Sequence, residues 1–150
     1  QNKESIEGLI NRYNEFQEGI RSQQVEQIAS LKERVEERTK VDWWVWKGWD
    51  LGVSFHDKAN RIGIESSFEA TEKGCCGKFH IYITTWNKPY WYPYKDYVLK
   101  SFPNYIKLDE NCGNRTYLHL PIIDGDKIDE IVNALVEVYD KLKVITDKIQ

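Results

Sequence analysis

Three segments in the middle of the chain alternate apolar and polar residues with a period of two. They cover residues 49–55, 61–68 and 79–86, and short stretches of turn-forming and polar residues join them. A period of two is typical of β-strands that bury one face, and short connections join such strands in antiparallel order. The alternation therefore predicts an antiparallel three-stranded meander with one apolar face.

Helical periodicity flanks this meander on both sides. Residues 3–38 lack proline and place apolar residues mostly three or four positions apart, which predicts one long helix. Residues 126–149 carry an unbroken apolar stripe, which predicts a second long helix. Between them, "YKDYVLKSF" predicts a short helix that ends before Pro103, and "TYLHLPI" predicts one more strand.

This order of elements is typical of an α+β fold. We expect a mainly antiparallel sheet, built from the meander plus one later strand, with the N-terminal and C-terminal helices packed on one face. Residues 1–40 then form a long N-terminal helix, and residues 41–150 form the α+β domain. The apolar stripe of the first helix is narrow, so this helix can seat on the sheet, form a homodimer with a second copy, or do both. We favour packing within the chain.

The composition limits the possible partners. A formal net charge of -3 excludes a global basic field that would attract nucleic acid, although 21 Lys and Arg residues leave room for a local basic patch. A mean hydropathy of -0.64 and the lack of a long apolar run predict a soluble chain without a membrane span. Three cysteines, two of them adjacent, indicate a reducing compartment, which we take to be the cytoplasm. The chain begins at Gln1 and contains no methionine, which indicates a processed or excised piece.

The tryptophans are concentrated near the start of the meander. Trp43, Trp44, Trp46 and Trp49 lie within seven positions, in "VDWWVWKGWDLGVSF". Trp49 is in phase with the apolar residues of the first predicted strand, so we expect it to face the core. We interpret most of this cluster as core and sheet packing.

A second aromatic segment, "NKPYWYPY", contains two prolines and is predicted to be a loop after the third strand. An exposed loop of this composition could stack on a planar ligand, while its lysines contact phosphates or a protein. The alternative, which we favour for the loop itself, is that it only caps the edge of the sheet. The candidate ligand-binding residues of the stacking hypothesis are Trp86, Lys88, Tyr90, Trp91, Tyr92 and Lys95.

The spacing of cysteines and histidines argues against a metal site. Cys75, Cys76, Cys112, His80 and His119 could in principle supply the ligands of a zinc ion. However, the sequence has no C-x2-C pair, and adjacent cysteines rarely chelate one ion comfortably. We expect no bound metal and no cofactor.

Carboxylates on the predicted strands allow one catalytic interpretation. Asp50 and Glu65 lie on neighbouring strands in the polar phase, and a hydrolase that uses a divalent metal needs clustered carboxylates. With His80, they would support a small hydrolase acting on a nucleotide or a phosphodiester. However, "IESS" lacks the lysine that a nuclease needs beside the second carboxylate, and no phosphate loop or nucleophile elbow is present. Catalysis is therefore the alternative hypothesis.

The run from Asp42 to about Trp91 resembles the C-terminal region of bacterial PD-(D/E)XK nuclease-like proteins. The similar features are the entry "DWWVWKGWDLGVSF", the strands "RIGIE" and "HIYITTW", and the aromatic "WYPY". Proteins of that family carry their nuclease core upstream of such a region, with an Asp followed on the next strand by Glu-x-Lys. Residues 1–40 contain no such motif. The resemblance therefore implies an accessory part without its own catalytic centre, and it assigns no active-site residue.

The leading hypothesis combines these features. It describes a non-catalytic accessory or interaction module of a bacterial or phage nuclease-like system. An aromatic and basic surface of this module would contact nucleic acid or a protein partner.

Overall fold

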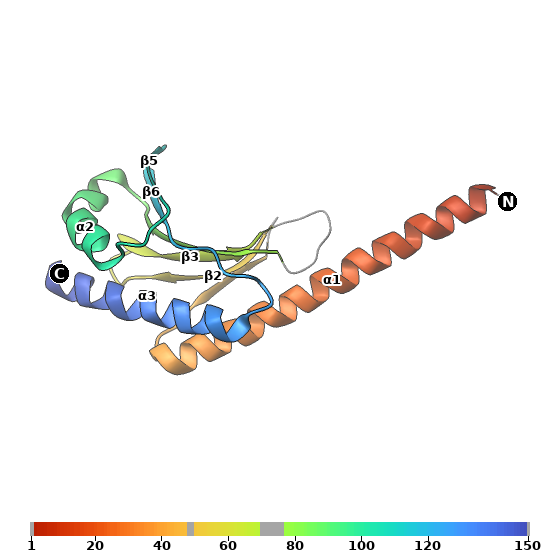
Figure 1. Ribbon diagram of the computed structural model, residues 1–150, viewed down its shortest axis with the longest axis horizontal. Coiled ribbons are helices and arrows are strands. Elements are labelled where there is room, and N and C mark those ends of the chain that lie inside the picture. The colour runs from red at the N-terminus through yellow and green to blue at the C-terminus, as the bar shows by residue number, and fades with distance from the viewer. Residues whose placement is uncertain (1, 48–49, 70–76, 150) are drawn as a thin grey trace.

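The computed structural model describes residues 2–47, 50–69 and 77–149, and the side chains of residues 6–15, 22–46, 50–69 and 77–149. These residues form three helices and six strands (Figure 1). The elements in chain order are α1 (Asn2–Thr39), β1 (Trp44–Lys47), β2 (Leu51–His56), β3 (Ile62–Phe68), β4 (Phe79–Thr85), α2 (Lys88–Ser101), β5 (Lys107–Cys112), β6 (Arg115–His119) and α3 (Ile128–Ile149).

All six strands belong to one antiparallel sheet, in the order β1-β2-β3-β4-β6-β5. β2, β3 and β4 form the meander that the alternation predicts, and β6 is the predicted later strand. The sheet twists strongly, so that β5 and β6 stand across the direction of β2 and β3 in Figure 1. The predicted α+β class with a mainly antiparallel sheet is confirmed.

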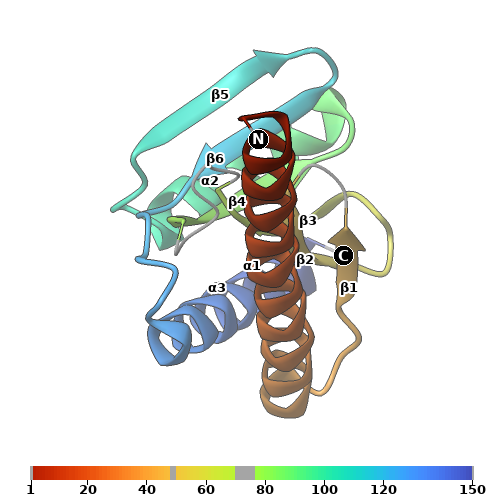
Figure 2. The same ribbon diagram turned by 90° about the vertical axis from the view of Figure 1, so that its right-hand side faces the viewer.

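The helices pack on one face of this sheet, which we call the covered face. α3 turns its apolar stripe to the sheet, with Ile131, Leu135 and Leu142 almost completely buried. α1 runs beside α3 through its C-terminal third, where Ile28 and Leu31 are fully buried (Figure 2). α2 packs on α3 at the other end of the sheet. The core therefore lies between the sheet and a single layer of helices.

The apolar phase of the strands supplies the other half of the core. Ile64 on β3 pairs with Phe55 on β2 and with Ile83 on β4, and Ile83 pairs with Leu118 on β6. Ile64, Ile83 and Leu118 are fully buried. Burying such a side chain contributes about 1.5–3 kcal/mol relative to leaving it in water. This row of aliphatic residues therefore holds the middle of the sheet against the helices.

The long N-terminal helix is confirmed, and its described side chains that are buried within the chain lie toward its C-terminal end. There, Arg34 donates to Asp129 of α3 at 2.6 Å, and Arg38 donates to the Asn133 side chain at 2.5 Å. The Thr39 hydroxyl accepts a hydrogen bond from the indole N–H of Trp43 at 3.0 Å. These contacts fix the end of α1 to α3 and to the entry of the sheet.

The sheet has two edge strands that the alternation does not predict. β1 and β2 are two arms of a hairpin, because Lys47 pairs with Leu51, so the predicted strand at 49–55 corresponds to β2 alone. In β5, Leu108 pairs with Leu118 and lies on the covered face, whereas the other side chains of the strand are polar or exposed. Backbone pairing with β6, rather than burial, therefore accounts for β5, and a hydrophobic pattern cannot detect it.

The aromatic segment after β4 is a helix, and the predicted loop is wrong. α2 begins at Lys88 and includes the whole of "KPYWYPY". Pro89 lies in the first turn, where its missing N–H has no helical partner to lose, so Pro93 is the proline that interrupts the helical hydrogen bonds. Burial of Trp91, Tyr94 and Val98 along one side offsets that loss. The helix ends at Ser101, before Pro103, as predicted.

Candidate functional site

The second face of the sheet carries the polar phase of the strand alternation, and none of the described helices packs on it. We call it the open face. The strand register places its side chains in rows that cross the whole sheet. The middle row consists of Trp44, Ser54, Glu65, Tyr82, His119 and Lys107, one from each strand.

Aromatic and imidazole rings touch one another along this face. Trp44 stacks on His56 with ring centroids 6.1 Å apart, and His56 contacts Trp86 at 4.5 Å. The Arg115 guanidinium lies 5.8 Å from the centre of the Trp86 ring and 5.0 Å from that of Tyr117. Both distances allow a cation–π interaction. The rings from β1 and β2 are thus joined to those of β6 through one arginine.

The contacts continue along β4 and β6. Tyr117 meets Tyr82 edge-on with centroids 6.0 Å apart, and Tyr82 meets His119 at 4.8 Å. His80 stacks on the other side of Tyr82 at 6.1 Å. We call the connected set the aromatic belt, and its members are Trp44, His56, Trp86, Arg115, Tyr117, Tyr82, His119 and His80.

Arg115 is the cation at the centre of the aromatic belt. Its Nη2 donates to the Glu65 carboxylate and lies 3.4 Å from the Thr84 hydroxyl. Its Nε is buried and has no hydrogen-bond partner among the described residues. Glu65 neutralises much of the guanidinium charge. This part of the face therefore offers planar ring surfaces more than a strong positive field.

Two glycines make room for indole rings on the open face. Gly52 pairs directly with Trp46, and a Cβ at Gly52 would come within 2.4 Å of the Trp46 ring. A Cβ at Gly63 would come within 2.6 Å of the Trp86 ring. The missing side chains leave the space that these rings occupy. The rings are therefore held by the sheet itself, which lowers the cost of ordering them for a ligand.

The three histidines of the chain, His56, His80 and His119, all lie on the open face. Burial lowers the pKa of His56, an effect that the nearby Glu65 opposes. Burial also lowers the pKa of His119, and the positive charge of Lys107 adds to this. Because an unperturbed imidazole has a pKa of about 6.5, these two rings are mainly uncharged at neutral pH. They act there as flat, polar rings rather than as cations.

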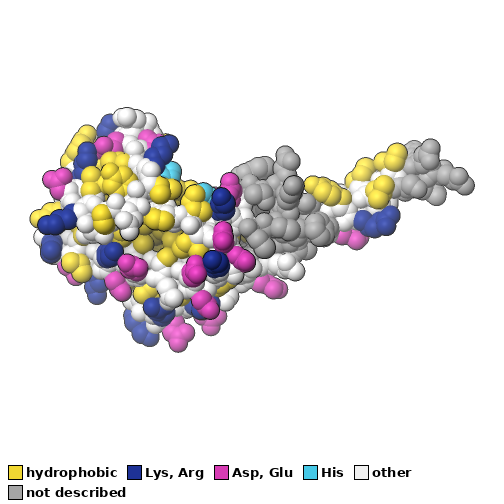
Figure 3. Space-filling model, viewed as in Figure 1, with side chains coloured by type: hydrophobic (Ala, Val, Ile, Leu, Met, Phe, Trp, Pro, Cys, Tyr) yellow, Lys and Arg dark blue, Asp and Glu magenta, His cyan; other side chains and the backbone are white. Residues whose placement is uncertain are grey.

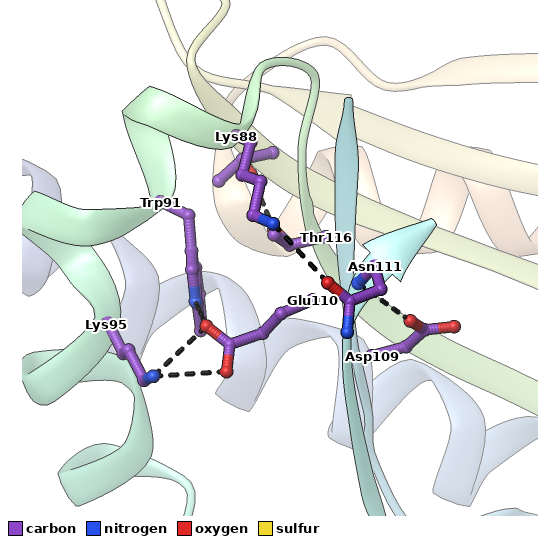
Figure 4. Close-up of polar contacts among 8 residues, drawn as sticks. Lys88, Trp91, Lys95, Asp109, Glu110, Asn111 and Thr116 are labelled. Carbon is purple, nitrogen blue, oxygen red and sulfur yellow. Dashed lines mark hydrogen bonds and ion pairs between the residues drawn. The ribbon is translucent and has the colours of Figure 1, made fainter. Parts of the chain in front are cut away.

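Trp91 and Lys95 do not belong to an exposed stacking surface. Trp91 is 0% exposed, and its indole N–H donates to Glu110 of β5 at 2.9 Å. Lys95 Nζ lies 3.1 Å from the same carboxylate (Figure 4). The hydrogen bond from Lys95, followed by that from Trp91, lowers the pKa of Glu110. A side chain without exposed surface cannot stack on a ligand, so Trp91 is corrected to a core residue that joins α2 to β5.

The other predicted ligand-binding residues are divided between two surfaces. Trp86 lies on the open face, whereas Lys88, Tyr90 and Tyr92 lie on α2. Lys88 Nζ is 3.4 Å from the Asn111 side chain (Figure 4), and Arg61 lies over the Tyr90 ring at 5.5 Å. Tyr92 is 61% exposed. The structure therefore does not bring the six predicted residues together.

Asp50 and Glu65 share the open face but do not form a carboxylate pair. Asp50 precedes β2, and its carboxylate accepts a hydrogen bond from the Trp46 indole N–H at 3.1 Å. Glu65 pairs with Ser54, four residues further along β2. At about 3.3 Å per residue, the two acidic residues are about 13 Å apart along the strand. Two carboxylates at that spacing cannot hold one divalent cation.

His80 lies apart from both of these carboxylates. Its Nε2 lies 3.7 Å from the carboxylate of Glu69, the one acidic partner that it has among the described residues. Glu65 is held by Arg115 instead. Among the described residues, no group of three or more His, Cys, Asp and Glu side chains is placed to hold a metal ion. Cys75 and Cys76 lie outside the described residues.

The tryptophan cluster at the start of the sheet divides between the two faces. Trp43 is 2% exposed and packs against Phe55 and Tyr139. Trp44, the next residue, is 64% exposed, so the expectation of packing is wrong for it. Trp49 lies outside the described residues. The sequence feature that could have revealed the open face is the presence of aromatic and histidine residues in the polar phase of the predicted strands. A search for hydrophobic periodicity alone does not detect them.

The chain matches no protein-family model, no curated protein and no solved structure. None of the helices in the described part of the chain is long and apolar enough to cross a membrane.

Proposed function

We propose that this chain is a non-catalytic interaction module that binds single-stranded nucleic acid on the open face of its sheet. The observation that supports this is the aromatic belt: ring contacts run continuously across a face that none of the described helices covers. Aromatic side chains on an open sheet are a recurrent platform for unstacked bases. Each stacked base contributes about 1–3 kcal/mol, with little dependence on sequence.

The charges of the open face favour weak binding. Lys107 and Arg115 can approach phosphates, but Glu65 already pairs with Arg115. Asp50 and Glu69 add negative charge at one end of the same face. Affinity should therefore come mainly from stacking, lie in the micromolar range or weaker, and depend only weakly on added salt, because few phosphates are neutralised.

The biological setting belongs to the same proposal. The tryptophan-rich entry and the strands that follow it resemble the accessory region of PD-(D/E)XK nuclease-like proteins, which would place the module in the cytoplasm beside a nuclease core. An Asp…Glu-x-Lys motif encoded upstream in the same reading frame would support this setting. A complete coding region that lacks such a motif would remove it.

The test is a low-salt fluorescence titration with a labelled single-stranded oligonucleotide. Trp44→Ala removes the most exposed ring of the aromatic belt, and Tyr92→Ala removes an equally exposed ring of α2. We expect Trp44→Ala to weaken binding about fivefold or more, the equivalent of one lost stacking contact. Tyr92→Ala should bind like the wild type.

The other outcomes of this titration contradict the proposal in different ways. Loss of binding in Tyr92→Ala alone would move the site to the outer surface of α2. No binding by any of the three proteins would exclude nucleic acid as the ligand. A protein partner would then be the better explanation of the open face.

A small hydrolase acting on a nucleotide or a phosphodiester is the second candidate. One observation favours it: Asp50, Glu65 and His80 lie on the same face. Release of product from mononucleotides or short oligonucleotides, with and without Mg²⁺, would test it. Activity that disappears in His80→Ala and Glu65→Gln would support a hydrolase. Activity that persists in both variants comes from a contaminant and would exclude this candidate.

A further inference from the structure

The two ends of α1 have different surroundings. Near the C-terminal end, Ile28, Leu31 and Val35 are fully buried. The N-terminal end extends well beyond the sheet and the other helices (Figure 1). We call the exposed apolar residues of this end the N-terminal stripe: Ile6 (57%), Leu9 (59%), Ile10 (53%) and Tyr13 (58%).

The N-terminal stripe lies on the side of α1 that packs on the core. Ile10 and Ile28 are 18 residues apart, as are Tyr13 and Leu31, from the sequence numbering. At about 3.6 residues per turn this separation is about five full turns, so each pair lies on the same side of the helix. In Figure 3 the hydrophobic side chains of the projecting part follow its upper edge, the side on which the sheet lies in Figure 1. One apolar side therefore continues beyond the body of the protein.

A projecting helix of this kind has little to stabilise it alone. α1 has 38 residues, which at about 1.5 Å per residue gives a length of about 57 Å. Among the described hydrophobic side chains of α1, Val25 is the first that packs against the core, so the exposed turns over residues 6–15 depend on helix propensity. Gly8 lowers that propensity by about 1 kcal/mol relative to alanine. Large apolar side chains exposed on such a segment indicate an interface.

The sequence of this segment is symmetric about Tyr13. Apolar residues stand three and seven positions before it, at Ile10 and Ile6, and three and seven positions after it, at Phe16 and Ile20. When such a helix meets an antiparallel copy of itself around Tyr13, these five apolar positions face one another, and Leu9 meets Gln17 beside them. This self-complementarity is what a two-fold symmetric contact requires. Spacings of three and four residues are also those of a helix–helix seam.

We propose that two copies of this chain form an antiparallel helix pair through the N-terminal stripe, with the two-fold axis at Tyr13. The overlap then covers residues 2–24 of each copy, the part of α1 before Val25, of which the structure describes the side chains of residues 6–15 and 22–24. Residues 2–24 contain three basic and four acidic residues, a net charge of -1. This balance does not attract an anionic membrane or nucleic acid, whereas a second copy needs only the apolar match.

The position of the protein body selects the antiparallel direction. A partner helix must lie on the stripe side of α1, and α3 with the sheet occupies that side from Ile28 onward. In a parallel pair, the C-terminal half of the partner helix would run into this body. In an antiparallel pair, it runs away beyond the N-terminal end. The pairing is independent of the nucleic-acid site, because none of the belt residues lies on α1.

The first test is the mass of the protein in solution, by sedimentation velocity over a concentration series. We expect a reversible dimer. Ile10→Asp and Tyr13→Asp should weaken the association by at least about tenfold, because each would bury a carboxylate in an apolar seam. Asn11→Asp is the matched control, since it adds the same charge on the opposite side of the helix and should still dimerise. The circular dichroism spectrum shows that each variant remains folded.

The second test fixes the direction, in a background with Cys75, Cys76 and Cys112 changed to serine. Under mild oxidation Tyr13→Cys should form a covalent dimer rapidly, because residue 13 faces its own copy. Ile6→Cys should not, because residue 6 faces residue 20. A parallel pair would cross-link both variants, which would overturn the proposal. A wild-type monomer at every concentration, or a dimer that tolerates both aspartate substitutions, would also overturn it.

Discussion

The covered face and the open face are built from the same strands and differ in how their rings are held. On the covered face, aliphatic side chains and buried rings such as Phe79 and Trp91 fill a closed space beneath the helices. On the open face, Trp44, Trp86 and Tyr117 are connected through His56 and Arg115 and keep some surface in solvent. For the aromatic residues of the strands, the phase on the strand therefore decides whether the ring is buried in the core or available at the surface. Aromatic content alone does not distinguish the two.

The sharpest test of this difference is Trp91→Ala on the covered face. It removes a completely buried indole and leaves the Glu110 carboxylate without one donor. We expect a loss of about 3–5 kcal/mol in the free energy of unfolding, the usual range for a buried tryptophan. Urea denaturation followed by circular dichroism measures it. Trp91→Phe, which keeps a ring but not the N–H, should lose less. A loss below about 1 kcal/mol for Trp91→Ala would mean that α2 does not pack as described.

Gly63→Ala tests how closely the open face is packed on its own strands. The new methyl group would meet the Phe55 carbonyl oxygen at 2.2 Å and the Trp86 ring at 2.6 Å. Because one of these neighbours is backbone, the strands must shift, and we expect a cost of about 1–3 kcal/mol in urea denaturation.

Gly8→Ala is the matched control for this change. At Gly8 the nearest atom to a new Cβ is the end of the Arg12 side chain, 4.0 Å away. An exposed helical glycine should gain about 0.5–1 kcal/mol on replacement by alanine. If Gly63→Ala raised the stability as Gly8→Ala is expected to do, the close contact of Trp86 with Gly63 would be disproved.

Much of the fold can be predicted from the sequence, because residues that face one core recur with the period of their strand or helix. The alternation around Ile64 and Ile83 and the helical stripe around Leu135 both reflect contact with one core, and both predictions are confirmed. β5 escaped prediction because backbone hydrogen bonds hold it. The N-terminal half of α2 was predicted as a loop because of its two prolines, whereas burial of its aromatic residues outweighs the interrupted helical hydrogen bonds.

The candidate site was less predictable than the fold. Its residues come from strands that are distant in sequence, such as His56 and Arg115, and only the order β4-β6 brings them together. The spacing of residues within one segment of the sequence does not reveal this strand order. The predicted stacking residues were adjacent in sequence, and the helix separates them: Trp91 points into the core while Tyr92 points to solvent. A helix turns neighbouring residues to different sides, so a sequence cluster is not a surface cluster.

The histidines predict a pH dependence that belongs to the open face. Burial lowers the folded-state pKa of His56 and His119 below the value of about 6.5 expected for the unfolded chain. The unfolded state therefore binds more protons as the solution is acidified. Stability is fully present above about pH 6.5 and falls as the pH drops through that value towards the folded-state pKa.

Urea denaturation at several pH values between about 8 and about 5 measures this effect, in the range where an imidazole with the usual pKa titrates. The double variant His56→Gln/His119→Gln should lose less stability than the wild type over this range. His80→Gln is the comparison, since it removes the remaining histidine of the same face. An unchanged pH slope in the double variant would show that these rings titrate equally in the folded and unfolded states.

The smallest effect on stability is expected for the substitution of Trp44, and the neighbouring Trp43 is the comparison. Trp43 and Trp44 are adjacent in sequence, but Trp43 is 2% exposed and Trp44 is 64% exposed. Trp43→Ala should therefore destabilise the fold by about 3–5 kcal/mol. Trp44→Ala should change the free energy of unfolding by no more than about 0.5 kcal/mol, because it opens no cavity and its ring contact is with the partly exposed His56. Urea denaturation of the two variants side by side measures the difference. If Trp44→Ala costs little stability yet weakens oligonucleotide binding, the Trp44 ring serves a ligand rather than the fold. A large loss of stability in Trp44→Ala would instead make the open face a structural surface.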